Sequence, residues 1–298
     1  MSVSIRQLKI FEATARLGRL TAAADDQAIS QSAASQALKE LESELGYPLF
    51  MRIGRELVIT DAGRNALPKV GQILQALDSL MHSEADEISG VLRVAASVTI
   101  GSYLLPGLLS QFIHKHPQVD PDVRISNTGE VISAVEKGQV HIGLIEGPAT
   151  HNHLLITPWS EDQLAVFCRP DHPLAAVGKL TATQIAQQRW VLREHGSGTR
   201  AVFDAAVQQV CGQVKLALEL NRQEAIKQSV KAGLGIGCLS ALSIAEQVDA
   251  GELVVLHTPL ELRRRFSLVS PPIEQSNALV RAFVEHLQQH AKAETVDK

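Results

Sequence analysis

Apolar and polar positions separate most clearly between residues 30 and 46, where the chain reads SQSAASQALKELESELG. One face of the predicted helix, with steps of four, three and four residues, carries Ala34, Leu38, Leu41 and Leu45. A face rotated well away from it carries short hydroxyls, an amide and one cation, namely Ser32, Gln36, Lys39 and Ser43, with Ser35 at its edge. Gln31, in the first turn, is a further polar candidate. Ser30 or Ser32 can cap the start of this helix, and Gly46 can end it in the left-handed conformation.

The neighbouring patterns favour a function for that polar face. A first helix is predicted from residue 5 to Gly18, followed by a short helix of small residues over 20–28. Small residues let two helices cross closely, as in a helix-turn-helix. Two short strands at 49–52 and 56–60 predict a wing. In this setting the polar face is suited to base edges and phosphates, whereas alone it would be typical of any amphipathic surface helix.

A longer helical pattern follows, from Asp61 to Ile88. Its apolar stripe runs through Ala66, Val70, Ile73, Leu74, Leu77, Leu80 and Met81. A stripe of this kind on a projecting helix requires a partner, and a second copy of the chain is the simplest one. Pro68 removes a helical hydrogen bond, so it predicts either a kink or a division into two shorter helices.

Beyond Ser89-Gly90, strand and helix patterns alternate. Strands are predicted at Val91–Ala96, Val123–Ser126, Ile142–Ile145, Leu164–Cys168, Trp190–Leu192, Leu216–Leu220, Gly235–Leu239, Leu253–Leu256 and Phe266–Val269. Alternation of this kind predicts an α/β fold with parallel sheets and helices on both faces. About 200 residues with this many strands exceed one simple sheet, so two lobes are expected.

Ligands of such sheets bind beyond the carboxyl ends of the strands. Residues 97–102 and 193–200 each follow a predicted strand and offer hydroxyls and glycine N–H groups before a helix. Either loop alone is typical of ordinary helix capping, but two facing loops would form an anion site. The candidate effector-binding residues are Ser97, Thr99, Ile100, Glu146, Ser197, Gly198 and Thr199.

Glu146, at the end of a predicted strand, complicates the anion site. An ionised carboxylate repels an anion at close range. Glu146 must therefore be protonated, be paired with a cation such as Arg193 or Arg200, or face a ligand that carries a proton. An ordinary strand-end carboxylate is the alternative. An enzyme that uses Glu146 as acid or base has little support, because no metal-ligand spacing, P-loop or nucleophile motif is present in the sequence.

Composition narrows the class of protein. The 298 residues are 45% hydrophobic and 20% charged, which is typical of a globular protein. The sequence has no apolar run of the roughly 20 residues that a membrane span requires, and MSVSIRQLKIFEA does not resemble a signal peptide. A cytoplasmic location is therefore expected. Cys168, Cys211 and Cys238 are widely spaced, which favours reduced, structural thiols.

Charge alone does not identify a nucleic-acid partner. Residues 1–66 hold as many acidic as basic side chains. A positively charged surface for DNA therefore requires the basic side chains to gather on one face. Lys39 lies on the polar helix face, and Arg52 and Arg55 lie on the predicted wing. With few cations per chain, tight binding to DNA requires several copies of the domain.

Residues 3–66 resemble the DNA-binding domain of LysR-type transcriptional regulators. The matching positions are Leu8, Phe11, Ala22-Ala23, Ser30-Gln31-Ser32-Ala33, Ser35, Leu41-Glu42, Leu45-Gly46, Leu49-Phe50, Arg52 and Thr60-Asp61-Ala62-Gly63. The resemblance implies a winged helix-turn-helix over 1–60, a dimerising linker helix over 61–89 and an effector domain like a periplasmic binding protein over 90–298. Its first lobe would comprise 91–162 and 267–298, and its second lobe 163–266.

The same resemblance implies double-stranded operator DNA, a homotetramer, RNA polymerase as a further partner and a small-molecule effector without a cofactor. Residues 97–106, 145–148, 190–200 and 221–240 resemble the CysL/YeiE branch, which is associated with sulfur metabolism and, in one member, with sulfite. Sulfite or a similar oxyanion is therefore the expected effector, and a small carboxylate is the alternative. His141 stands where this branch usually has Asp. A solute-binding protein of the same lobed fold would explain neither residues 1–66 nor the missing signal peptide.

Overall fold

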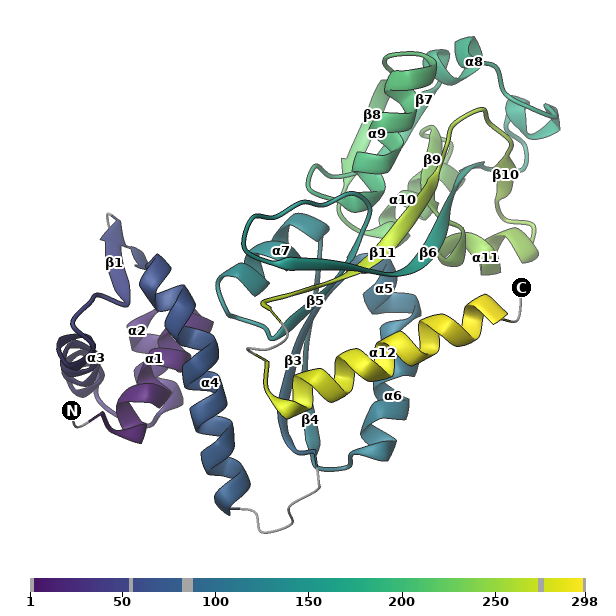
Figure 1. The fold of residues 1–298 in the computed structure, drawn as a ribbon. Helices are drawn as coiled ribbons and strands as arrows, with labels where there is room; N and C mark the ends of the chain where they lie inside the picture. The colour runs from purple at the N-terminus through teal and green to yellow at the C-terminus, as the bar shows by residue number, and fades with distance from the viewer. Residues whose placement is uncertain (1–2, 54–55, 82–87, 273–275, 297–298) are drawn as a thin grey trace.

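The computed structural model describes residues 3–53, 56–81, 88–272 and 276–296. In the described N-terminal region, helices and a two-stranded antiparallel wing follow the order α1 (Ile5–Leu17), α2 (Leu20–Asp26), α3 (Gln31–Leu45), β1 (Phe50–Ile53) and β2 (Glu56–Ile59) (Figure 1). The Ser30 hydroxyl accepts a hydrogen bond from the Ala33 N–H at 3.2 Å, and Gly46 ends α3 with a φ of 80°. Ser30, rather than Ser32, is therefore the cap.

The predicted apolar face of α3 forms the core of this region. Ala34 and Leu41 are fully buried, and Leu38 is nearly so. Ala34 also packs with Ile10 and Ala24 in a small separate cluster, where the short side chains let α1, α2 and α3 approach closely. The polar face of α3 therefore points away from the core.

A single helix, α4 (Asp61–Met81), follows the wing and runs without interruption through Pro68. The alternative of two shorter helices is therefore wrong over this range, and Ile88, at the end of the predicted helix, is not helical. Val70 is buried against the N-terminal core, and Leu74 packs beside it. Part of the apolar stripe is thus covered by its own domain, whereas Ile73 is half exposed.

The remaining strands form one mixed sheet in the described residues, in the order β4-β3-β5-β11-β6-β9-β7-β8, with β10 paired to β6. The strands are β3 (Gly90–Ser97), β4 (Val119–Ser126), β5 (Ile142–Glu146), β6 (Leu155–Cys168), β7 (Arg189–Arg193), β8 (Lys215–Leu220), β9 (Ile236–Ser240), β10 (Val254–Leu256) and β11 (Arg263–Ser270). The helices are α5 (Val98–Tyr103), α6 (Leu105–Lys115), α7 (Thr128–Glu136), α8 (Ala182–Gln187), α9 (Gly198–Val210), α10 (Gln223–Lys231), α11 (Ala241–Asp249) and α12 (Ala278–Val296), with a 3-10 turn, η1 (Pro173–Ala176).

The two-lobed α/β architecture is as predicted, but the sheet is not wholly parallel. β11 pairs antiparallel with β5 and β6, and β6 pairs antiparallel with β9 and β10. The long strands β6 and β11 run from one lobe into the other, as Figure 1 shows. They form the connection between two apolar cores, one around Phe112 and Phe283 and the other around Trp190 and Phe203.

The cysteines are free in the structure, and their environments do not favour reactive thiolates. Burial raises the pKa of Cys168 to about 11 and that of Cys238 to about 12. Burial also raises the pKa of Cys211, which is more accessible. These observations agree with structural thiols. Among the described helices, none has the length and apolarity needed to cross a bilayer.

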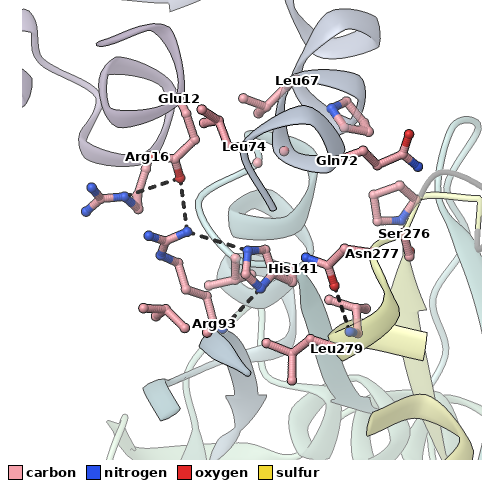
Figure 2. Close-up of a pocket in the computed structure, with 18 of the residues that line it drawn as sticks. Glu12, Arg16, Leu67, Gln72, Leu74, Arg93, His141, Ser276, Asn277 and Leu279 are labelled. Carbon is pink, nitrogen blue, oxygen red and sulfur yellow. Dashed lines mark hydrogen bonds and ion pairs between the residues drawn. The ribbon is translucent and has the colours of Figure 1, made fainter. Parts of the chain in front are cut away.

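His141 precedes β5 and joins it to β3. Its N–H donates to the Arg93 carbonyl at 2.9 Å, and its Nδ1 accepts from the Arg93 N–H at 3.2 Å (Figure 2). Since Nδ1 is an acceptor, the imidazole is neutral and protonation would break this contact. Burial, followed by the charge of Arg93, lowers the pKa of His141 to about 4.

Stability is therefore expected to fall as the pH falls from 6.5 toward 4. In this range the unfolded chain binds a proton at His141 that the folded chain does not, a difference of up to about 3 kcal/mol. His141→Asn keeps an acceptor but cannot be protonated in this range, so its free energy of unfolding should depend less on pH. Urea denaturation at several pH values measures the difference, and equal slopes would contradict the assignment.

Candidate functional site

A buried cluster of ionisable side chains lies where β6 and β11 pass between the lobes. Arg264 on β11 donates from Nε to Asp162 Oδ2 at 2.7 Å, and its Nη2 lies 3.2 Å from Glu146 Oε2. The side chains of Arg264, Glu146 and Asp162 are 0%, 1% and 3% exposed. One guanidinium is therefore shared by two carboxylates where the two lobes join.

Hydroxyl and amide groups from both lobes complete the cluster. Arg264 donates to Thr99 Oγ1 at 3.1 Å and to Thr199 Oγ1 at 2.8 Å. Thr199 in turn donates to Glu146 Oε1 at 3.1 Å, and Gln223 Nε2 donates to Thr99 Oγ1 at 2.9 Å. Thr99 belongs to the first lobe, whereas Thr199 and Gln223 belong to the second. The network therefore connects the lobes.

Several buried donors of this region remain available to a ligand. Thr99 Oγ1 already accepts two hydrogen bonds, so its own hydrogen is left to donate. Ser97 Oγ and Arg193 Nη1 are buried and have no hydrogen-bond partner within the described part of the chain. Because an unsatisfied buried donor is unfavourable, these groups favour a bound acceptor such as an oxyanion.

A cavity of about 590 Å³ adjoins Arg264. Its lining includes Gly147, Val202 and two exposed arginines, Arg263 and Arg265. Cations at the edge of a cavity raise the local concentration of anions.

The structure brings three of the predicted effector residues into direct contact around Arg264: Thr99, Glu146 and Thr199. Ser97 lies at the end of β3, two residues before Thr99. Ile100 is fully buried in the first-lobe core, so its side chain does not face the cluster.

The remaining two candidates lie at the start of α9. Ser197 is its N-cap, and the Ser197 hydroxyl accepts from the Arg200 N–H at 3.5 Å. A Cβ atom on Gly198 would lie 1.7 Å from the Glu146 carbonyl oxygen. Glycine at this position therefore permits the close approach of the two lobes.

Two expectations require correction. Glu146 is paired with Arg264, whereas Arg193 binds Glu194 and Arg200 binds Asp204. Residues 98–102, predicted to be a loop, form part of the short helix α5. Sequence patterns alone also miss Arg264, Asp162 and Gln223. The side chains of Arg264 and Asp162 point to the buried side of their strands.

The candidate DNA interface is the polar face of α3. Gln31, Ser32, Gln36 and Lys39 are exposed, Ser35 is partly exposed, and Arg52 on β1 is exposed. Arg55 lies outside the described residues. Gln36 Nε2 donates to Glu40 Oε1 at 2.8 Å, which leaves the Gln36 carbonyl oxygen and its second N–H for a base edge.

Glu42 holds the wing against α3. One of its carboxylate oxygens accepts from the backbone N–H groups of Leu49 and Phe50, at 2.8 and 3.1 Å. The start of β1 is thus fixed to the helix whose outer face carries the candidate DNA contacts. This arrangement sets the position of Arg52 relative to Gln36.

Family models match both parts of the chain. Residues 5–64 match the bacterial regulatory helix-turn-helix protein of the LysR family, and residues 85–292 match the LysR substrate binding domain. The chain is 38% identical over 288 residues to the uncharacterized HTH-type transcriptional regulator YeiE of Escherichia coli K12, an alignment that covers 96% of this chain and 97% of YeiE. This similarity agrees with the branch predicted from the sequence.

Solved structures share the fold. A full-length OxyR variant from Pseudomonas aeruginosa aligns with a TM-score of 0.72 and 22% identity, over 98% of this chain and 95% of that one. The Synechocystis PCC6803 CcmR regulatory domain in complex with 2-PG aligns with a TM-score of 0.63 and 27% identity, over 68% of this chain and 98% of that one. The chain belongs to the LysR family of DNA-binding transcriptional regulators and carries an effector-binding domain.

Proposed function

We propose that this regulator binds operator DNA through the polar face of α3 and the wing, and that a small oxyanion, sulfite, is its effector. The observation that carries the effector assignment is a set of buried donors: Thr99 Oγ1 in the interlobe cluster, Ser97 Oγ at the end of β3 and Arg193 Nη1 at the end of β7. The similarity to YeiE supports the same branch of the family. Because its target is DNA, we place its action in the cytoplasm.

The charge balance of the cluster favours a ligand that carries a proton. Arg264 faces two carboxylates, Glu146 and Asp162, so the three groups together are not cationic. A fully ionised anion would be repelled by Glu146 at short range. Hydrogen sulfite avoids this repulsion, since it can donate its proton to Glu146 while its oxygens accept from Thr99 and Ser97.

A small carboxylate is the second candidate effector. The similar CcmR regulatory domain has been solved with 2-PG. The cavity of about 590 Å³ beside Arg264 has room for an organic acid larger than sulfite, although Ser97, Thr99 and Arg193 do not line it. Exposed Arg263 and Arg265 would attract either anion.

Thr99→Ala tests the effector site. This change removes a donor to the ligand and the acceptor of Gln223 and Arg264, so sulfite affinity should fall about 10-fold or more. Operator affinity without sulfite should be unchanged, because Thr99 lies far from α3 in the chain and in a separate domain. Isothermal titration with sulfite and with a panel of small carboxylates measures the change. Thr99→Ser, which keeps the hydroxyl, is the matched control, and unchanged sulfite affinity in Thr99→Ala would contradict the proposal.

We further propose a homotetramer that dimerises through α4. Ile73 is 51% exposed on α4, and apolar side chains also face outward on the edge strands β4 and β8, where Ile125 is 44% and Leu216 is 48% exposed. Exposed apolar groups on projecting or edge elements are typical of subunit interfaces. Two α3 helices spaced by about 34 Å would read half-sites one helical turn apart. RNA polymerase as a partner stays a prediction.

Gln36→Ala is expected to reduce discrimination at one base pair by about 1–3 kcal/mol, because the carboxamide can no longer bind a base edge. Affinity should be measured for the wild-type site and for all single-base variants of one half-site. Lys39→Ala is the comparison, since loss of a phosphate contact should weaken all sequences equally and lower the salt dependence. A uniform loss in Gln36→Ala would contradict the base contact.

A further inference from the structure

Within the described residues, the N-terminal domain and the linker helix contact the first lobe of their own chain, and two of these contacts are close. In the first, Arg93 Nη1 on β3 donates to Glu12 Oε1 on α1 at 3.0 Å. In the second, Leu67 on α4 packs against Gly138, where a Cβ atom would lie 1.9 Å from Leu67 Cδ2. Gly138 has a φ of 65°, so glycine there serves both the turn and the close approach.

A cavity of about 700 Å³ lies beside these contacts (Figure 2). Its walls come from α1, α4, β3 and the start of α12, and include Leu67, Leu74 and Leu279. An interface that leaves such a space has few van der Waals contacts for its extent. The stability of this interface therefore depends strongly on the ion pair between Glu12 and Arg93, whose side chains are 21% and 19% exposed.

His141 fixes the lobe side of the ion pair. Arg93 and His141 exchange two hydrogen bonds through the Arg93 N–H and carbonyl, which aligns the start of β5 with β3. The next residues along, Val94 and Ile142, are direct partners in the parallel ladder. Figure 2 shows Arg93 between Glu12 and His141. We call Glu12, Arg93 and His141 the clasp.

The same two strands end at the interlobe cluster. β3 leads from Arg93 to Ser97 and on to Thr99, and β5 leads from His141 to Glu146. The four steps of extended strand from Arg93 to Ser97 span about 13 Å. The strands are neighbours in the sheet, and their central residues are buried, so they move together as a stiff unit. A ligand that displaces Thr99 and Glu146 thus acts on the far end of the elements that hold the clasp.

We propose that the clasp is the contact through which effector occupancy sets the orientation of the DNA-binding domain on the first lobe. The clasp leaves the polar face of α3 exposed, so it controls the direction of that face rather than access to it. The clasp lies at the start of β3 and β5, and the interlobe cluster lies at their carboxyl ends. Because the interface around the cavity has few packing contacts, the Glu12–Arg93 pair can separate. This inference rests on the proposed effector site, and its test is built to separate the two.

The test uses the full-length protein with Glu12→Gln, Arg93→Gln and the double variant. Asp61→Asn is the matched control, because Asp61 pairs with Arg64 at the start of α4 and neither residue lines the cavity or contacts the clasp. Sulfite affinity is measured by titration calorimetry. Affinity for a genomic fragment selected by the wild-type protein is measured with and without sulfite. Hydrogen–deuterium exchange of residues 5–17 and 138–142 reports on the clasp itself without sulfite.

All variants are expected to bind sulfite within about 2-fold of the wild type. The sulfite-induced change in DNA affinity, typically about 5- to 150-fold for coupled sites, should fall below about 2-fold in the three clasp variants and persist in Asp61→Asn. The double variant should equal either single variant, because a broken pair cannot be broken again. Residues 5–17 should exchange faster in the clasp variants alone.

The proposal would be overturned if either single variant kept the wild-type sulfite-induced change in DNA affinity. It would also be overturned if the losses of the two single variants added in the double variant. Exchange that is equal in all five proteins would also overturn it. A wild-type protein that binds no sulfite would overturn the proposed effector and leave the exchange result to decide the clasp.

Discussion

Arg264→Met is expected to destabilise the protein by about 3–5 kcal/mol, because it leaves two buried carboxylates without their cation. Methionine fills much of the arginine volume, so the loss is electrostatic rather than a cavity effect. Asp162 would keep the bond from Ser240 at 2.9 Å, and Glu146 would keep the bond from Thr199 at 3.1 Å, but neither donor carries a charge. Urea denaturation at neutral pH measures the free energy of unfolding.

Two further variants isolate the cause. Lys231→Met removes the cation of an exposed pair with Glu252, so it should change the free energy of unfolding by less than about 1 kcal/mol. Adding Glu146→Gln and Asp162→Asn to Arg264→Met should recover part of the loss, since no buried charge then remains. A triple variant less stable than Arg264→Met would contradict the account of the cluster.

Gly198→Ala is expected to weaken sulfite binding about 100-fold or more, the second large effect. The added Cβ would lie 1.7 Å from the Glu146 carbonyl oxygen and 2.9 Å from Glu146 Cγ, so the lobes must separate to admit it. Separation removes Thr199 from Glu146 and Arg264, and an affinity loss of 100-fold corresponds to about 2.7 kcal/mol. Calorimetry measures the affinity, and small-angle scattering detects the opening.

Gly107→Ala is the matched control for this variant. Gly107 also lies within a helix, α6, and a Cβ atom there would meet nothing within 4 Å. Alanine in a helix is favoured over glycine by up to about 1 kcal/mol, so this variant should be slightly stabilised and should bind sulfite normally. Normal binding in Gly198→Ala as well would show that the contact with Glu146 is not required.

The order of strands and helices can be read from the sequence because apolar runs and caps are local signals. The helices α8 and α11, for example, begin directly after Thr181 and Ser240, whose side chains cap them. Strand direction is a different matter: the antiparallel pairing of β11 with β5 and β6 depends on contacts far apart in the chain. The local pattern carries no information on that pairing.

Arg264 escapes sequence reasoning because it stands in the run Arg263-Arg264-Arg265, which is typical of an exposed surface. Its position nevertheless carries a signal. Leu262, Arg264 and Phe266 alternate at period two, and all three are buried in the structure. A charged residue in the apolar phase of a strand predicts a buried partner, although the sequence cannot identify Glu146 and Asp162 as that partner.

The linker stripe shows the converse limit. Its spacing correctly predicts a helix with an apolar face, and the simplest partner is a second chain. In the structure, Val70 and Leu74 are instead covered by the chain's own N-terminal core. Periodicity identifies a face that must be covered, and only the tertiary arrangement decides what covers it.

The two long strands that join the lobes limit how this molecule can change shape. A hydrogen-bonded ribbon such as β6 with β11 resists stretching and shear, because either would break several ladder bonds at once. Torsion about its length breaks none of them, so the lobes must turn relative to one another rather than slide. Arg264 and Asp162 are direct partners in this ribbon, so any such rotation turns the lobes about the buried cluster.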